Sequence, residues 1–157
     1  MPPPPVIGLE LAAPGDLEAL LALEERCFPS PISLSRRQFQ YLFRRPTVSV
    51  YVLRQGGQIV GDAVILRRRG RSGALTARLY SLAVDAACRG QGLGRAILTK
   101  CIRLLRAEGA RSVGLEVAVE NTPAIRLYES LGFVRTGHAP DYYAPGGHAL
   151  KMKLELR

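Results

Sequence analysis

The sequence is poor in the residues that most often carry nucleophilic or metal chemistry. Its 157 residues include no tryptophan, two histidines and three cysteines. Cys27, Cys88 and Cys101 are odd in number and lack metal-ligand spacing, so we expect free thiols in a reducing, cytoplasmic compartment and no metal. His138 and His148 both lie near the C-terminus, and Cys88 has no base beside it in sequence. The sequence therefore disfavours a Ser-His-Asp or Cys-His arrangement and a covalent intermediate on such a nucleophile.

Long apolar segments are also missing. No apolar run approaches the ~20 residues that cross a bilayer, and we expect no membrane association. The start, Met1–Pro5, lacks the basic and apolar regions of a signal peptide. We expect residues 1–5 to form a disordered proline-rich tail. Residues 6–157 are long enough to bury one core and are expected to form a single domain.

Acidic residues are scarce relative to basic ones. The chain has 22 Lys and Arg against 13 Asp and Glu, a formal net charge of +9. Such a balance suits a nucleic acid, an acidic partner or a polyanionic cofactor, and equally a solvated basic surface. The densest cluster comprises Arg67, Arg68, Arg69 and Arg71 and is expected at a hairpin tip. No aromatic residue interleaves with it as a stacking platform would, so nucleic acid is the weaker of these partners.

A glycine-rich turn organises the middle of the chain. The apolar run Tyr80–Val84 leads to the turn Arg89–Arg95, and an amphipathic segment follows to Glu108. Glycines at alternate positions leave one wall of the turn without side chains, so that a ligand can approach the main chain. The following helix would offer unpaired N–H groups and the positive end of its dipole. The sequence therefore predicts a strand, a phosphate-binding loop and a helix.

Two well-known phosphate loops fit this turn poorly. The ATP-type loop requires Lys-Ser/Thr after its last glycine, whereas Arg95 follows Gly94. The dinucleotide fingerprint requires G-x-G-x-x-G, whereas Gly90, Gly92 and Gly94 give G-x-G-x-G. A dinucleotide-binding module stays an alternative, with Glu120 as the acid that would contact a ribose.

The turn does match the pattern R/Q-x-x-G-x-G/A, through Arg89, Gly92 and Gly94. In this the sequence resembles the GNAT superfamily of acetyl-CoA-dependent N-acetyltransferases, whose version of the loop binds the coenzyme A pyrophosphate. The resemblance implies acetyl-CoA as the acetyl donor.

Hydrophobic periodicity predicts the remaining elements. Helices are expected at 17–27, 36–45, 93–108 and 123–131, with Asp16, Ser35 and Thr122 as caps of the first, second and fourth. Strands are expected at 6–11, 47–52, 59–66, 74–84, 113–119 and 150–156, with a short strand starting at Phe133. A Gly56–Gly57 hairpin turn joins two strands of an antiparallel meander. The pattern predicts a mixed α/β sandwich, in which a GNAT-like central mixed sheet of about seven strands carries about four helices on both faces.

Three polar residues in the second half stand out. Glu116 shares its strand face with the small residues Gly114 and Ala118, which leave space beside a carboxylate, although a solvent-facing glutamate fits the same pattern. Tyr128 lies on an apolar helix face, where a tyrosine is commonly a core residue. Asn121 suits the start of a helix. The residues alone leave these alternatives open.

Taken together, Leu-Glu-Val, Asn121 and Leu-Tyr-Glu-Ser-Leu-Gly-Phe resemble GNAT N-terminal acetyltransferases of the bacterial ribosomal-protein-alanine type, over about Leu79 to Tyr143. The resemblance implies that Glu116 is the general base, that Tyr128 protonates the leaving thiolate, and that Asn121 contacts the cofactor. It further implies cofactor contacts from Leu82, Ala83 and Val84 through the main chain, and from Arg89, Gly90, Gln91, Gly92, Leu93, Gly94 and Arg95 at the pyrophosphate.

The acceptor is less sharply indicated. Asp141-Tyr142-Tyr143 resembles the loop that covers the peptide in those enzymes, so Tyr142 and Tyr143 are expected to bind the substrate. The family's aromatic residue after Phe-Pro is missing, because Ser30 follows Pro29. The context of Leu79-Tyr80-Ser81 is also similar to GNAT domains joined to peptidase-like domains. A peptide or protein N-terminal α-amine is favoured. A small-molecule amine, a lysine side chain, or a nucleotide- or nucleic-acid-binding module without catalysis remain alternatives.

Overall fold

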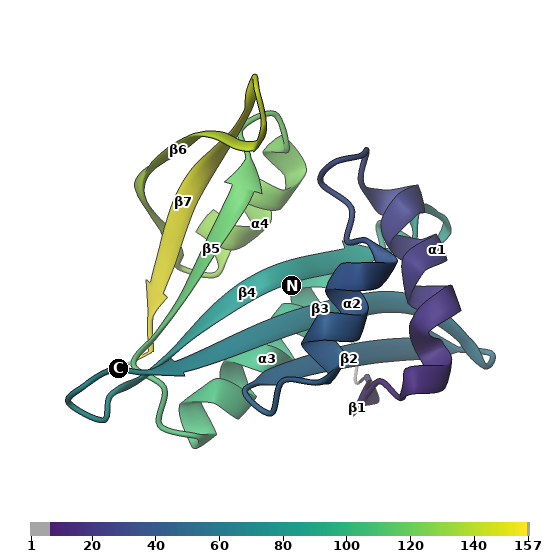
Figure 1. Ribbon diagram of the computed structural model, residues 1–157, viewed down its shortest axis with the longest axis horizontal. Coiled ribbons are helices and arrows are strands. Elements are labelled where there is room, and N and C mark those ends of the chain that lie inside the picture. The colour runs from purple at the N-terminus through teal and green to yellow at the C-terminus, as the bar shows by residue number, and fades with distance from the viewer. Residues whose placement is uncertain (1–6, 157) are drawn as a thin grey trace.

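The computed structural model describes residues 7–156, so the predicted tail at 1–5 lies outside the described residues. The strands are β1 (Leu9–Leu11), β2 (Val48–Gln55), β3 (Gln58–Arg69), β4 (Leu75–Val84), β5 (Ser112–Ala118), β6 (Val134–Ala144) and β7 (Gly147–Glu155). The helices are α1 (Leu17–Cys27), α2 (Arg36–Phe43), α3 (Leu93–Ala107) and α4 (Thr122–Ser130). Within the described range, all seven strands form one sheet in the order β1-β2-β3-β4-β5-β7-β6 (Figure 1). The predicted mixed sheet with four helices is confirmed.

The strands from β2 to β4 form the predicted antiparallel meander. Gly56 and Gly57 have φ angles of 58° and 80°, which glycine adopts without strain, and they close the turn between β2 and β3. The arginine cluster differs from the prediction. Since β3 continues to Arg69, three of the four arginines extend from a strand and only Arg71 lies in the turn.

β4 and β5 are parallel and separate soon after they meet. Only three residues of each strand pair, from Ala77↔Val113 to Leu79↔Leu115, although both strands continue beyond. Immediately after Leu79, β4 carries a bulge, because Val64 and Ile65 of β3 pair with Ser81 and Leu79 and so leave Tyr80 as an extra residue. A bulge bends its strand and increases its twist. This bend coincides with the divergence of β4 from β5 in Figure 1, and we call the part of the sheet where the two strands no longer pair the β4–β5 gap.

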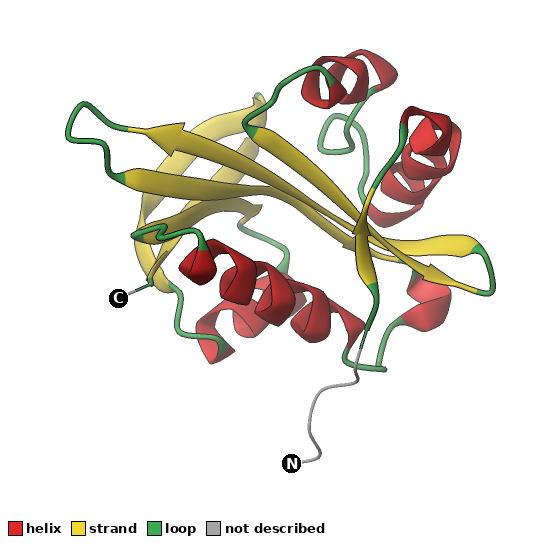
Figure 2. Cartoon of the chain, turned by 90° about the horizontal axis from the view of Figure 1, so that it is seen from below, coloured by secondary structure: helices red, strands yellow, loops and turns green. Residues whose placement is uncertain are grey.

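The helices cover both faces of the sheet (Figure 2) and create two cores. On one face α3 packs through Ile97, Leu98 and Leu105, with Tyr128 of α4 in the same core. On the other face α1 and α2 form a separate core that includes Phe39. Burying a side chain of this size contributes roughly 1.5–3 kcal/mol relative to exposure. The sheet therefore separates two clusters of buried side chains.

Two of the three predicted helix caps are wrong. Ser35 caps α2 as expected, and its hydroxyl accepts a hydrogen bond from the Gln38 N–H. Asp16 does not cap α1, because a 3₁₀ turn precedes the helix and gives Asp16 helical dihedral angles rather than the extended ones of a capping residue. Its carboxylate instead accepts from the Ala13 N–H and pairs with Arg54.

Helix α4 is capped by Asn121 rather than by Thr122, which is the first helical residue. The Asn121 side chain accepts from the Ala124 N–H at 3.3 Å. The strand after α4 is also longer than the predicted short segment, since β6 extends from Val134 to Ala144 and pairs with β7.

A pair of buried carboxyl groups lies between α1 and the sheet. Glu24 of α1 and Asp62 of β3 are both fully buried. Glu24 accepts hydrogen bonds from the Leu34 N–H at 3.2 Å and the Ser81 hydroxyl at 2.8 Å, whereas neither oxygen of Asp62 has a donor within residues 7–156. Burial raises the pKa of Asp62 well above its usual range, and the negative charge of Glu24 raises it further. Burial also raises the pKa of Glu24. A proton shared by the two groups would remove their repulsion.

This pair predicts an unusual dependence of stability on pH. A carboxyl whose pKa is higher in the folded protein than in the unfolded chain binds its proton more tightly when folded. Its contribution to stability is therefore present at low pH and is lost as pH rises from about 4 toward the folded-state pKa. We expect Asp62→Asn to raise the free energy of unfolding at pH 8 by on the order of 1–3 kcal/mol, and this gain to shrink toward pH 4.

Urea denaturation of both proteins at pH 4, 6 and 8 measures the effect. Asp16→Asn is a control for which we expect the opposite change in stability. The Ala13 N–H and Arg54 lower the pKa of Asp16, whereas burial raises that of Asp62. The control variant should lose stability at pH 8 and lose less at low pH. A gain for Asp62→Asn that is constant with pH would contradict the shared proton.

Candidate functional site

The edge of β4 that faces the β4–β5 gap presents free main-chain groups. The Asp85 N–H donates to the Val60 carbonyl of β3 at 2.8 Å. Because main-chain groups alternate in direction along a strand, Leu82 and Val84 face the gap and Ala83 faces β3. The Val84 carbonyl accepts from Cys27 Sγ at 3.3 Å and from Arg89 Nε at 3.2 Å. The main-chain groups of Leu82 and the Val84 N–H are therefore placed to pair with an extended ligand.

The glycine turn ends at the start of α3 with its donors uncapped. Gly92 is the N-cap, with a φ of 75°, and provides no side chain to cap the helix. The first main-chain bond at this end runs from Ala96 to the Gly92 carbonyl, which leaves the N–H groups of Leu93, Gly94 and Arg95 without an intrahelical acceptor. These donors and the helix dipole suit an anion.

The three glycines of this turn differ in why glycine is suited to each position. Gly90 and Gly92 have positive φ angles, and a side chain at either would meet no atom within 4 Å. They are required by the backbone conformation and leave open space above the turn. Gly94 has ordinary helical geometry, and a Cβ there would lie 3.5 Å from the Leu127 side chain, an ordinary contact. Without a side chain at Gly94, a ligand can approach the main chain at the helix terminus closely.

The charged side chains of the turn are partly engaged by the protein. Arg89 reaches back to β4 through the Val84 carbonyl. Arg95 donates to the Ser130 hydroxyl at 2.5 Å and so connects the start of α3 to the end of α4. Gln91 is exposed. Positive charge thus remains on both sides of the turn.

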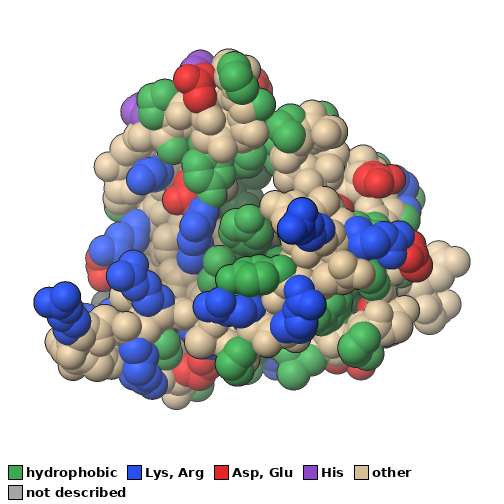
Figure 3. Space-filling view, in the orientation of Figure 1, with side chains coloured by type: hydrophobic (Ala, Val, Ile, Leu, Met, Phe, Trp, Pro, Cys, Tyr) green, Lys and Arg blue, Asp and Glu red, His purple; other side chains and the backbone are tan. Residues whose placement is uncertain are grey.

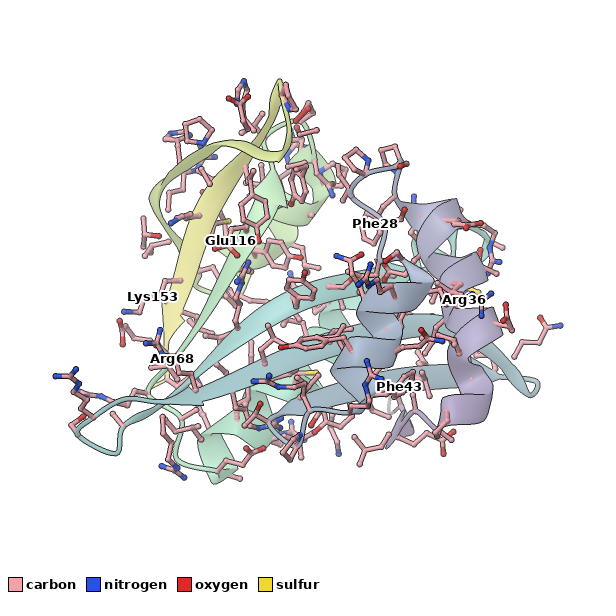
Figure 4. All side chains as sticks on the ribbon, in the orientation of Figure 1. Phe28, Arg36, Phe43, Arg68, Glu116 and Lys153 are labelled. Atoms are coloured by element: carbon pink, nitrogen blue, oxygen red, sulfur yellow. The ribbon has the colours of Figure 1, made fainter. Side chains whose placement is uncertain are left out.

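Glu116 lies on β5 beside the gap and is bound by an arginine that the sequence did not single out. Its Oε1 lies 2.6 Å from Nη2 of Arg78 on β4, and its side chain is 17% exposed. Arg78 also donates to the Tyr142 hydroxyl and lies 5.4 Å from the centroid of the Tyr80 ring. Figure 4 shows Glu116 on β5 and Phe28, on the segment after α1, on opposite sides of β4. The solvent-facing alternative for Glu116 is wrong, because the carboxylate is mostly buried and paired.

Tyr142 and Tyr143 lie in β6 where the strand leaves its partner. Between the pairs Ala139↔Ala149 and Ala144↔Gly147, four residues of β6 face one residue of β7. The two rings contact each other edge to face, with centroids 4.9 Å apart. Burial raises the pKa of Tyr143 to about 12, with Tyr142 and then Glu116 adding to the effect. The predicted substrate residues therefore adjoin the predicted base.

Tyr128 of α4 packs in the hydrophobic core, as expected for a tyrosine on an apolar helix face. Its ring lies 5.6 Å from that of Phe133. Burial raises its pKa, and Tyr143 raises it further. Because an ordinary tyrosine already has a pKa of ~10, the Tyr128 hydroxyl is protonated at neutral pH. Asn121 uses its carbonyl oxygen as the α4 cap, which leaves its side-chain N–H groups available.

The structure thus brings together Leu82, Val84, the α3 terminus, Glu116 and the two tyrosines of β6. Arg78 is the residue that the sequence interpretation missed. A signal was present, since Leu75, Ala77 and Leu79 alternate inward and set Arg78 on the opposite face in mid-strand. The sequence does not reveal that Arg78 pairs with Gly114 of the parallel strand β5. Gly114 is two residues before Glu116 and on the same face of that strand.

The described residues add two further observations. None of the helices within residues 7–156 combines the length and apolarity needed to span a bilayer. In the same part of the chain, no three side chains of His, Cys, Asp or Glu gather as a metal ion would require.

The family model and the relatives described here are all acetyltransferases. The model of the acetyltransferase (GNAT) family matches residues 17–133. The mycothiol acetyltransferase of Thermobispora bispora is 37% identical over 144 residues, which cover 84% of this chain and 48% of that protein. The N-alpha-acetyltransferase RimI of Mycobacterium tuberculosis is 37% identical over 94 residues, which cover 60% of this chain and 57% of that protein. The chain spans about half the length of the curated relatives it matches.

A solved structure agrees over nearly the whole chain. The ribosomal-protein-S18-alanine N-acetyltransferase of Escherichia coli has a TM-score of 0.81 and 28% sequence identity, and the match covers 96% of this chain and 94% of that one. The similarity therefore extends over nearly all of the fold described above.

Proposed function

The chain belongs to the acetyltransferase (GNAT) family, and on that premise we propose that it transfers the acetyl group of acetyl-CoA directly to the N-terminal α-amine of a peptide or protein. The observation that carries the proposal is the β4–β5 gap. It places an unpaired strand edge, an uncapped helix terminus and a carboxylate around one opening. The proposal includes a cytoplasmic location, which accords with the three free cysteines.

The donor fits the residues on both sides of the gap. Leu82 and Val84 would pair with the amides of the pantetheine arm as an added strand does. The N–H groups of Leu93, Gly94 and Arg95 would bind the pyrophosphate, since they lack acceptors and lie at the positive end of α3. The exposed turn before α3 leaves room for this approach. Acetyl-CoA supplies the activated acetyl group.

The acceptor amine must lose a proton before it can attack the thioester carbonyl. An α-amine with a pKa of ~8 is roughly one-tenth neutral at pH 7, whereas a lysine with a pKa of ~10.4 is almost entirely charged. Glu116 would take this proton, directly or through a water molecule. One of its oxygens is held by Arg78, and the other has no partner among residues 7–156. Arg78 thus acts as a positioning residue for the carboxylate.

The leaving thiolate also needs a proton, and Tyr128 would supply it. A tyrosine with an ordinary pKa of ~10 is protonated at neutral pH, and burial raises the pKa of Tyr128 further. The C–S bond of the thioester breaks as the C–N bond of the amide forms. One proton passes from the amine to Glu116, and another passes from Tyr128 to the sulfur. The proposed transfer needs no covalent enzyme intermediate.

On the acceptor side, Tyr142 and Tyr143 would contact the substrate, with the segment after α1 as the opposite wall (Figure 4). Similarity to a mycothiol acetyltransferase over 84% of this chain favours a small-molecule amine as a second candidate. A screen of peptide α-amines, peptides with lysine as the sole amine, and small amines separates these acceptors. Acetylation of small amines alone would overturn the peptide assignment.

The base is tested by Glu116→Gln, which preserves shape but cannot accept the proton. We expect turnover with a peptide acceptor to fall by ~10²-fold or more near pH 7. Turnover should recover partly as rising pH deprotonates the amine without help. Steady-state kinetics from pH 6 to 9 measures both effects, and calorimetry with acetyl-CoA checks that donor affinity is unchanged.

Glu120→Gln is the matched control, because Glu120 is exposed beyond the end of β5. It removes the same charge and should leave turnover within about two-fold of wild type. Wild-type turnover in Glu116→Gln, with a normal pH profile, would remove Glu116 from the mechanism.

The acid is tested by Tyr128→Phe, which deletes only the hydroxyl from a packed ring. Because no hydrogen bond of that hydroxyl occurs within the described range, we expect the melting temperature to stay nearly constant. Turnover should fall at least ~10-fold while acetyl-CoA affinity persists. Thermal denaturation, calorimetry and initial rates provide the three readouts. Full activity in the variant would leave Tyr128 as a core residue only.

A further inference from the structure

A large arginine-lined groove lies beside the site, between α2, the end of β3 and the first half of β4. Its volume is about 950 Å³. No Asp or Glu is among the residues that line it. Figure 3 shows Lys and Arg side chains around the hollow on this face. Six arginines line the groove: Arg37, Arg44, Arg45, Arg67, Arg68 and Arg78. We call this the arginine groove.

Most of this positive charge is not neutralised by the protein. Arg67 pairs with Glu108 at 2.6 Å, and Arg78 pairs with Glu116. The other four arginines of the groove form no ion pair with an acid anywhere in residues 7–156. They are also exposed. The groove therefore offers several guanidinium groups to a ligand of opposite charge.

Arg78 connects the arginine groove to the proposed acceptor position. It lines the groove and holds Glu116 at the same time. Arg68 pairs across the strands with Thr76, two residues before Arg78 on β4. Strand spacing places the Arg68 and Arg78 backbones about 8 Å apart. An extended peptide covers that distance in about two to three residues.

We propose that the arginine groove binds acidic side chains at about the second to fifth positions of the acceptor peptide, so that the enzyme prefers an N-terminus followed by Asp or Glu. The inference rests on the proposed function, because it places the acceptor amine at Glu116. Arginine suits this task, since its planar fork matches a carboxylate with two parallel hydrogen bonds.

The aromatic residues of the groove favour a peptide over a nucleic acid. Single-stranded nucleic acids stack their bases on free aromatic faces. Tyr41 and Tyr80 line the groove, but Arg45 lies 5.3 Å from the centroid of the first ring and Arg78 lies 5.4 Å from that of the second. Guanidinium groups of the chain itself therefore cover one face of each ring.

Two peptides that differ only in charge test the preference. One carries Ala-Glu-Asp-Glu-Asp at its N-terminus, the other carries Ala-Gln-Asn-Gln-Asn, and both continue identically. At saturating acetyl-CoA and physiological salt, we expect the acidic peptide to have a KM on the order of 10-fold lower, with kcat within about two-fold, since each exposed ion pair contributes modestly. Equal KM values with acetylation of both peptides would overturn the groove assignment and leave the proposed function standing.

The double variant Arg44→Gln/Arg68→Gln should abolish this difference in KM and leave the glutamine peptide unaffected. Arg103→Gln/Arg126→Gln is the matched control, because both residues are exposed on helices outside the groove and form no ion pair within residues 7–156. It should retain the preference. Loss of the preference in both double variants would indicate a general effect of net charge and overturn the assignment.

A binding measurement separates this inference from the proposed function. Fluorescence anisotropy with an N-acetylated acidic peptide, the glutamine peptide and a 12-nucleotide RNA needs no turnover. We expect the acidic peptide to bind most tightly and to lose affinity in Arg44→Gln/Arg68→Gln. Tighter binding of the RNA at the same salt concentration would overturn the inference. Arginine-dependent binding of the acidic peptide, without acetylation of any free amine, would overturn the proposed function alone.

Discussion

The early separation of β4 from β5 is the constraint on which the rest of the site depends. β4 has ten residues and β5 has seven, but only Ala77–Leu79 of β4 pairs with β5. The bulge at Tyr80 bends β4 immediately after the last pair. Without that bend, β5 would occupy the edge that Leu82 and Val84 now present, and Glu116 would lie within a closed sheet. One extra residue in β4 therefore accounts for the free edge of β4 and for the position of the carboxylate.

The two layers that cover the sheet hold the sides of the gap in different ways. On the α3 face, the helix begins directly after the turn that follows β4, so its uncapped terminus lies close to the strand edge. On the α1–α2 face, Glu24 accepts from the Leu34 N–H and the Ser81 hydroxyl, which ties the segment between α1 and α2 to β4. The position of this segment thus depends on a buried carboxyl whose neighbour Asp62 weakens the fold as pH rises.

Much of the architecture could be predicted because local chemistry specifies it. The Gly56–Gly57 turn, the alternating strands and the glycine turn before α3 each carry a strong local signal, and all are observed. The caps at Asp16 and Thr122 were wrong because a preceding 3₁₀ turn and a competing Asn121 decided them. Local propensity cannot rank such alternatives.

The site was predictable only in part, for a different reason. The roles of Glu116 and Tyr128 came from a resemblance, and the sequence alone left a solvated and a buried alternative for them. Arg78 is 38 positions from Glu116 in the chain, and their contact depends on a parallel register that no local pattern encodes. The burial of Asp62 against Glu24 is likewise a long-range consequence of packing α1 on β3.

Amide hydrogen exchange with and without coenzyme A tests the central claim most directly, because it reports on the main-chain donors that the gap exposes. The account predicts slower exchange on addition of coenzyme A at Leu82, Val84 and the segment from Gly90 to Arg95. Exchange at Ala83, whose N–H faces β3, should change little. Protection confined to the arginine groove, or no change at the edge of β4 despite saturating coenzyme A, would contradict it.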